Sequence, residues 1–265
     1  MLSKAAAEVL LTADPIGKAV RSRDAAKRWY EGKIAALGDH IPPDRPARPE
    51  KPVLLRPGKM PKRKIGIGPG GRIALLHALA HIELNAIDLA WDIVGRFTAH
   101  DPGLPKVFFD DWVGVADDEA RHFLMLQQRL EELGAHYGEL PAHDGLWQAA
   151  QSTAHDLQAR LAVVPMVLEA RGLDVTPAMI ERLKAVGDPQ SAEILTVIHD
   201  DEISHVSAGV RWFHWLCKES GQEPAETWRC LVATYFRGEI KPPFNRVSRN
   251  KAEFPEDFYN PSVPD

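Results

Sequence analysis

The chain has 265 residues, of which 45% are hydrophobic and 26% are charged, and its formal net charge is −5. This balance is typical of a globular protein with a core, and it gives no overall bias toward nucleic acid or an anionic membrane surface. The two cysteines, Cys217 and Cys230, exclude a disulfide framework, and we expect both to be buried thiols. The length allows one large domain or a smaller domain with extensions.

The first residues predict a helix rather than an export signal. The apolar patch after Met1 is short, ends at Asp14 and Pro15, and is not followed by a small-residue cleavage site. No uninterrupted apolar run approaches the roughly 18 residues that indicate a membrane-spanning helix. We therefore expect a cytoplasmic protein with no membrane partner.

Two amphipathic helices are predicted before a proline-rich connector. They cover residues 3–13 and about 16–36, so that residues 1–37 form an N-terminal helical region. Eight prolines follow within residues 38–70. Proline excludes both regular helix and central strand, and we therefore predict an extended connector that lies over the rest of the protein.

The remaining sequence predicts an all-α fold with a four-helix bundle over residues 71–219. The helices are expected at about 71–100, 106–134, 152–172 and 189–219, with a short helix at 176–185 before the last of them. The segment from 135 to 151 is long enough for the crossover connection that some four-helix bundles contain. A last helix at 224–237 and an aromatic tail complete residues 220–265, and we expect both to pack on the bundle.

The run Asp-Glu-x-x-His occurs twice, at 118–122 and 201–205, each time inside a predicted long helix. Each run is preceded by a helix with one glutamate on its apolar face, Glu83 or Glu169. Residues three apart on a helix share a face, so the Glu and the His of one run can bind the same metal ion. Buried carboxylates need a partner. The pattern therefore predicts a carboxylate-bridged site for two metal ions.

Six residues form the predicted site, and they divide into two sets of three. The first ion would be held by Glu83, Glu119 and His122, and the second by Glu169, Glu202 and His205, with Glu119 and Glu202 as bridges. A single Glu-x-x-His pair would more simply be solvated, and a lone glutamate would lie at a helix edge. The prediction depends on the ligand types, their order and their apolar setting together. Imidazole and carboxylate ligands suit iron and manganese alike.

Two aspartates and one proline lie beside the predicted ligands. We expect Asp118 and Asp201 to accept hydrogen bonds from the N–H groups of the ligand histidines; the alternative is that both are ordinary exposed aspartates. Pro165, four residues before Glu169, should kink its helix or open a local bulge. That distortion would lie either near the metal ions or at the surface, where it would have no chemical role.

Other candidate residues have simpler structural interpretations. A basic cluster could bind phosphate on a nucleotide, a coenzyme or RNA, although a solvated linker explains it as well; its members are Lys59, Lys62, Arg63 and Lys64. His77 and His81 lie on a different face from Glu83, so a structural or surface role is expected. The tryptophans near the ligand helices are expected to be core or interface residues, namely Trp112, Trp212 and Trp215.

The ordered ligand set carries a family resemblance. Glu83, the run Asp118-Glu119-Ala120-Arg121-His122, Glu169 and the run Asp201-Glu202-Ile203-Ser204-His205 resemble the ferritin-like superfamily of di-iron carboxylate proteins over about residues 72–218. That superfamily includes ribonucleotide reductase small subunits, bacterial multicomponent monooxygenases, acyl desaturases and tRNA-modifying hydroxylases. The first run looks especially like the oxygen-activating branch. The proline-rich lead-in and the Pro-Pro-Phe-Asn tail look like a ferritin-like domain family catalogued without an assigned function.

The resemblance implies activation of O₂ or peroxide at two iron ions, with transfer of oxygen or electrons to an organic substrate, either a small molecule or a tRNA-type substrate. The sequence contains no nucleotide-cofactor motif or reductase domain, so an external electron donor is expected, and the assembly could be a homodimer. Two alternatives stay open. One is peroxide disproportionation at manganese, or iron oxidation, on the same scaffold. The other is a non-catalytic bundle held together by its metal ions, although six ligands for two ions leave coordination positions open.

Overall fold

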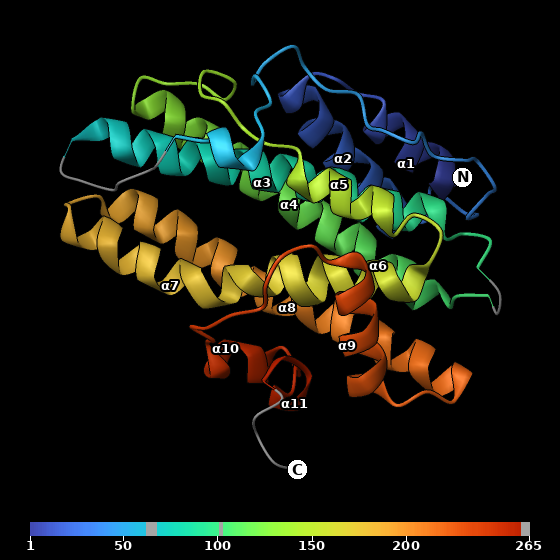
Figure 1. Ribbon diagram of the computed structural model, residues 1–265. Helices are drawn as coiled ribbons and strands as arrows, with labels where there is room; N and C mark the ends of the chain where they lie inside the picture. The colour runs from blue at the N-terminus through green and yellow to red at the C-terminus, as the bar shows by residue number, and fades with distance from the viewer. Residues whose placement is uncertain (62–67, 101–102, 261–265) are drawn as a thin grey trace. The chain divides into compact units, whose positions relative to one another are not determined.

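The computed structural model describes residues 1–61, 68–100 and 103–260 (Figure 1). Within these ranges the chain forms helices α1 to α11 and two short segments, η1 and η2, and it contains no strand; an isolated β-bridge joins Leu54 and Ala142. The all-α prediction is confirmed for these residues. The chain divides into two compact units, Met1–Trp147 and Gln148–Asp265. The four-helix bundle and the predicted four-part division of the chain stay predictions.

The first unit is organised around α3 and α4, which lie side by side (Figure 1). Its elements are α1 (Leu2–Leu10), α2 (Pro15–Tyr30), η1 (Pro57–Lys59), α3 (Pro69–Arg96) and α4 (Lys106–Glu132). Helix α1 packs on α3, and α2 packs on α4. The second predicted helix, at 16–36, was too long, because Gly32 adopts a left-handed conformation with φ of 72° just after α2 ends.

The described connector residues form backbone hydrogen bonds to the end of α1 and to the segment after α4. The backbone N–H of Ala47 donates to the Leu10 carbonyl at 2.8 Å, and that of Leu55 donates to the Ala142 carbonyl at 2.8 Å. Of the basic cluster, Lys62, Arg63 and Lys64 lie outside the described residues, and Lys59 closes η1. Residues 38–61 therefore contain no α-helix, and specific backbone hydrogen bonds hold them in place.

The second unit contains a long helical run and its packing partners. Its elements are α6 (Leu157–Val163), the π-helix η2 (Val164–Glu169), α7 (Ala170–Ala185), α8 (Pro189–Ser220), α9 (Pro224–Tyr235), α10 (Arg246–Lys251) and α11 (Glu256–Tyr259). Helix α8 packs against η2 and α7, and α9 packs against α6. Helix α5 (Gly145–Ser152) spans the boundary between the units along the chain, and most of it lies in the segment predicted to be a crossover.

Helices α6, η2 and α7 follow one another without a break, so the predicted separation into helices at 152–172 and 176–185 was wrong. Pro177 lies inside α7, where it cannot donate to the carbonyl of Leu173 one turn earlier. The side-chain amide of Asn245 donates to that carbonyl at 3.1 Å. The tail thus supplies the hydrogen bond that proline removes, which explains why the helix continues.

Two expectations about exposure need correction or qualification. Cys217 is buried, but Cys230 is exposed on α9, so the expectation of two buried thiols was wrong for Cys230.

Among the described helices, α3 meets a test of length and composition for a membrane span, with a mean hydropathy of 1.4 over an 18-residue window. Because 72% of that window is buried in the protein, and the core helix of a soluble protein meets the same test, this is weak evidence for a membrane span.

Candidate metal centre

Two carboxylates and an imidazole converge in the first unit. Glu83 comes from α3, and Glu119 and His122 come from α4; at most 3% of any of the three is exposed. The His122 Nδ1 atom lies 3.2 Å from Glu83 Oε2 and 3.6 Å from Glu119 Oε2. One ligand atom from each of the three residues lies within 4.8 Å of the others. This buried Glu/His cluster could therefore hold a metal ion.

Local helix geometry and apolar packing place these side chains. Glu119 and His122 are three residues apart on α4 and share its inner face, and that face is lined by Phe123 and Leu126, which are fully buried. Glu83 projects from α3, where Ala80 is fully buried one turn earlier. The packing of α3 on α4 brings the third ligand to the other two.

The electrostatics of the cluster favour a cation. Burial raises the pKa of the Glu83 carboxyl well above its usual value, and the negative charge of Glu119 raises it further, whereas the hydrogen bond with His122 acts in the opposite direction. Two carboxylates confined in an apolar setting repel each other when both are ionised. A divalent cation between them would remove that repulsion and restore the ionised form of Glu83.

The second Glu-x-x-His run lies on α8, in the second unit. The His205 Nδ1 atom is 3.6 Å from Glu202 Oε2, which is the same separation that His122 and Glu119 have on α4. His205 is buried, and the Glu202 side chain is 12% exposed. Glu169 is half-buried at the last position of η2, the π-helix that packs against α8.

The structure thus brings the predicted ligands together in two sets. Glu83, Glu119 and His122 form one cluster, and Glu202 and His205 form a pair on α8. That the two sets together make one dinuclear site, with Glu169 as a ligand, stays a prediction. The predicted distortion at Pro165 is confirmed as a π-helix, and it ends at the residue predicted to be a ligand.

The two aspartates beside the ligands have different settings. Asp118 forms an ion pair with Arg121 at 2.8 Å on its own helix, and about one third of its side chain is exposed. Asp201 is half-buried on α8. The hydrogen bonds that we expected from the ligand histidines to these aspartates stay predictions.

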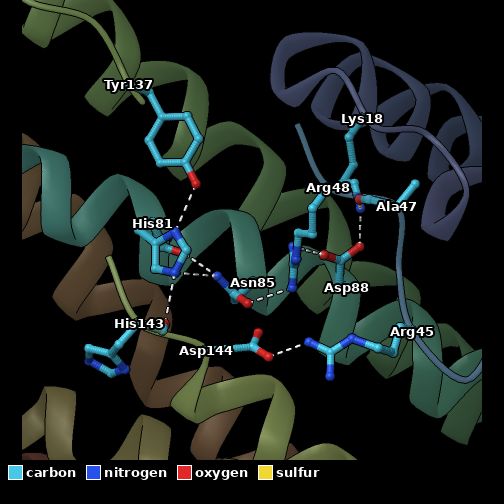
Figure 2. A network of polar contacts seen from close by, with 10 residues as sticks. All are labelled: Lys18, Arg45, Ala47, Arg48, His81, Asn85, Asp88, Tyr137, His143 and Asp144. Carbon is cyan, nitrogen blue, oxygen red and sulfur yellow. Dashed lines mark hydrogen bonds and ion pairs between the residues drawn. The ribbon is translucent and has the colours of Figure 1, made fainter. Parts of the chain in front are cut away.

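A buried charge network that the sequence did not predict links α3 to α2 and to the connector (Figure 2). Asp88 of α3 is fully buried and pairs with both Lys18 of α2 and Arg48 of the connector. Arg48 also donates to the Asn85 side-chain carbonyl at 2.6 Å. Asp88 interrupts the same apolar helix as Glu83. An acidic residue in an apolar helix can be noticed in the sequence. Its partners cannot be predicted there, because Lys18 and Arg48 lie 70 and 40 residues away along the chain.

The histidines at the start of α3 have structural roles. His77 Nε2 accepts a hydrogen bond from the backbone N–H of Gly138 at 2.9 Å. His81 contacts the Tyr137 hydroxyl through Nδ1 at 2.8 Å and the His143 carbonyl through Nε2 at 3.0 Å (Figure 2). Because a carbonyl can only accept, Nε2 carries the proton and Nδ1 accepts from the tyrosine. Both histidines are buried, so a structural role is confirmed and a surface role is excluded.

The tryptophans near the ligand helices were expected in the core or at interfaces. Trp112 is fully buried on α4, and Trp212 is buried on α8, where its ring contacts Trp215 edge to face with centroids 6.0 Å apart. The core interpretation is confirmed for Trp112 and Trp212.

Fold and site together define an all-α protein with a buried carboxylate–histidine cluster that could hold a metal ion. The chain belongs to the family described as "Protein of unknown function (DUF455)", which matches residues 11–260. A relative from Haemophilus influenzae, named "Uncharacterized protein", is 40% identical over 226 residues, which cover 84% of this chain and 78% of the relative. No solved structure matches the chain. Membership of the ferritin-like superfamily stays a prediction.

Proposed function

We propose that this protein is a dinuclear-metal oxidoreductase, with iron as the resident metal, that uses O₂ or peroxide to hydroxylate or oxidise an organic substrate. The observation that carries the proposal is the convergence of Glu83, Glu119 and His122 within 4.8 Å in a buried setting. The matching 3.6 Å separation within Glu202 and His205 supports a second, equivalent half of the site.

The donor atoms fit the proposed metal. In the proposal, one ion would be held by Glu83, Glu119 and His122 and the other by Glu169, Glu202 and His205, with Glu119 and Glu202 as ligands shared by both. Oxygen and imidazole nitrogen suit iron and manganese, and this donor set has no thiolate of the kind that closed structural zinc sites use. Four carboxylates would also balance the charge of two divalent ions, which buried ionised groups require.

The residues of this chain would perform three tasks at such a centre. The carboxylates neutralise the ions, the histidines complete the ligand sets, and buried side chains such as Phe123 and Leu126 exclude water from the cluster. When bound, the two ions would supply the redox chemistry with O₂ or peroxide. The proposal includes an external electron donor and a cytoplasmic setting, as expected from the sequence.

The proposal is tested by elemental analysis of full-length protein purified without added metal, and by its absorption spectrum during anaerobic reduction and re-exposure to O₂. We expect about two iron ions per chain and an absorption band that is lost on reduction and returns with O₂. Two manganese ions instead would overturn the iron assignment and favour peroxide chemistry. No bound metal after reconstitution with iron or manganese would overturn the proposal.

Matched variants test whether the two ligand sets act as one site. Glu119→Gln and Glu202→Gln each remove one carboxylate, and each should lower the content of both ions, because both residues are proposed bridges. Glu193→Gln is the control, since Glu193 lies exposed on α8, and it should keep the full metal content. Loss of one ion in Glu119→Gln with no change in Glu202→Gln would show that the two sets do not share a site.

A further inference from the structure

The second unit contains a cavity of about 130 Å³ beside the π-helix. Its walls include Met166 and Val167 of η2, Trp228 of α9, and Phe244, Arg249 and Tyr259 from the C-terminal part of the chain. The size is close to that of the ~150 Å³ apolar cavities that bind benzene. The lining is mainly apolar and aromatic, as in ligand pockets, with a small number of polar groups that could fix an orientation.

Two polar groups on the wall of this cavity are buried without a hydrogen-bond partner among the described residues: Arg249 Nη1 and the Tyr259 hydroxyl. Arg249 is 3% exposed and Tyr259 is 5% exposed. A buried polar group left without a partner costs roughly 1–3 kcal/mol. Two of them on one cavity wall indicate a site that a ligand completes.

The guanidinium group of Arg249 is held in a fixed position. Its Nε and Nη2 atoms donate to the two carboxylate oxygens of Asp174 at 2.9 and 2.8 Å. Its central carbon lies 4.1 Å from the centre of the Tyr259 ring. Burial raises the pKa of the Tyr259 hydroxyl above its usual value, so this group keeps its proton and can donate. The cavity therefore presents two oriented donors beside an apolar wall.

The charges around the cavity favour an anion. The Asp174 carboxylate is shared between Arg249 and Arg171, whose Nη1 atom lies 3.5 Å from it. Glu239 and Lys241 lie 3.9 Å apart and are both exposed, so they offset each other in solvent. Two guanidinium groups against one buried carboxylate leave an excess positive charge at this site.

We propose that this cavity binds a small hydrophobic carboxylate. The carboxylate group accepts hydrogen bonds from Arg249 Nη1 and from the Tyr259 hydroxyl, and the aromatic or aliphatic body lies against Met166, Val167 and Trp228. None of these residues belongs to the proposed metal centre, and binding requires no metal ion. Because η2 ends at Glu169, an occupant that packs against Met166 and Val167 would also restrict the turn that carries this glutamate.

Binding is measured by isothermal titration calorimetry on the full-length, metal-free protein in the presence of a chelator, with benzoate and hexanoate as probes. We expect both carboxylates to bind, benzamide to bind at least tenfold more weakly, and benzylamine not to bind. No heat from either carboxylate at millimolar concentration, or equal affinity for benzamide, would overturn the proposal. Since no metal is present, this result is independent of the outcome for the oxidoreductase.

Three variants locate the site. Tyr259→Phe removes a hydroxyl that has no partner among the described residues, so it should leave the thermal stability unchanged or higher while benzoate affinity falls about five- to tenfold. Val167→Phe should fill the cavity and abolish binding. Tyr235→Phe is the control, because the Tyr235 hydroxyl contacts His155 at 3.1 Å on an exposed surface. Unchanged affinity in Tyr259→Phe and Val167→Phe would place the benzoate elsewhere.

Discussion

The ring of Pro165 occupies the space that a side chain on Gly209 would need. A Cβ atom at Gly209 would lie 2.5 Å from both Cβ and Cγ of Pro165, which is closer than real Cβ contacts. Gly209 follows the predicted ligand His205 by one turn of α8, and Pro165 belongs to the π-helix that ends at Glu169. The absence of a side chain at Gly209 thus lets the π-helix approach α8 next to two predicted ligands.

Gly209→Ala should therefore destabilise the protein. In an ordinary helix, replacing glycine with alanine stabilises by about 1 kcal/mol. Here the added methyl group meets a rigid proline ring, and overpacking of this kind costs roughly 1–3 kcal/mol. We expect the melting temperature of metal-free protein, followed by circular dichroism, to fall by several degrees. Metal content should also fall, because relief of the clash displaces the turn that carries Glu169.

A second glycine provides the control for this prediction. Gly172 lies within α7, and a Cβ atom there would have no atom within 4 Å. Gly172→Ala should leave the melting temperature unchanged or raise it. If Gly209→Ala raised it equally, the close approach of Pro165 to Gly209 would be wrong.

The features that the sequence predicted well depend on neighbouring residues. The start of α8 was predicted correctly at Pro189 and its end within one residue, because Asp188 caps its first turn and Gly221 ends it in a left-handed conformation. The pairing of each ligand Glu with its His was also predicted well, because residues three apart in one helix lie on the same face. The bulge at Pro165 is likewise a local consequence of proline.

The features that could not be predicted from the sequence depend on partners far along the chain. Helix α7 continues through Pro177 because Asn245, 72 residues after Leu173, hydrogen-bonds to the carbonyl that proline leaves open. The pairing of Asp88 with Lys18 depends on how α2 lies against the rest of its unit. No local pattern predicts the meeting of Arg249 with Asp174, 75 residues earlier, and the cavity beside them follows from that meeting.

Replacing Glu83 with Gln should have opposite effects with and without metal. In metal-free protein near neutral pH, the buried Glu83 carboxyl must either take up a proton or repel the Glu119 carboxylate, and both cost stability. Glu83→Gln removes that cost, while the amide oxygen can still accept from His122. We expect its melting temperature to exceed that of the wild type by a few degrees. With saturating Mn²⁺ or Fe²⁺ the order should reverse, because ligand at about 100 times Kd stabilises by about 2.7 kcal/mol and the variant binds metal more weakly.

Differential scanning fluorimetry with and without added metal measures both halves of this prediction. Glu193→Gln, at an exposed position on α8, controls for the effect of removing any one negative charge and should show no reversal. A lower melting temperature for metal-free Glu83→Gln would contradict the electrostatic description of the cluster.

In the buried network around Asp88, replacing Asp88 should destabilise the protein more than replacing its partner Lys18. Asp88→Asn leaves Lys18 and Arg48 without their shared counterion, and removing one partner of a buried pair costs about 3–5 kcal/mol. Lys18→Met leaves Asp88 paired with Arg48 and removes an ammonium group whose burial disfavours its charged form, so it should destabilise the protein less than Asp88→Asn. Urea unfolding of both variants measures the difference, and equal destabilisation would show that Arg48 does not compensate for Lys18.

The pH dependence of stability should contain a contribution from His81. Burial is the main cause that lowers its pKa from 6.5 to about 4. Below pH 6.5 the unfolded chain therefore gains a proton at this residue that the folded chain does not, and stability falls until about pH 4, where the folded state also becomes protonated. The full effect is on the order of 3 kcal/mol.

Urea unfolding of metal-free protein between pH 4 and 7.5 should show a shallower loss of stability for His81→Gln than for the wild type. Replacing the exposed His136 with Gln should leave the wild-type slope unchanged, and an equal slope in all three proteins would mean that His81 titrates normally in the folded state.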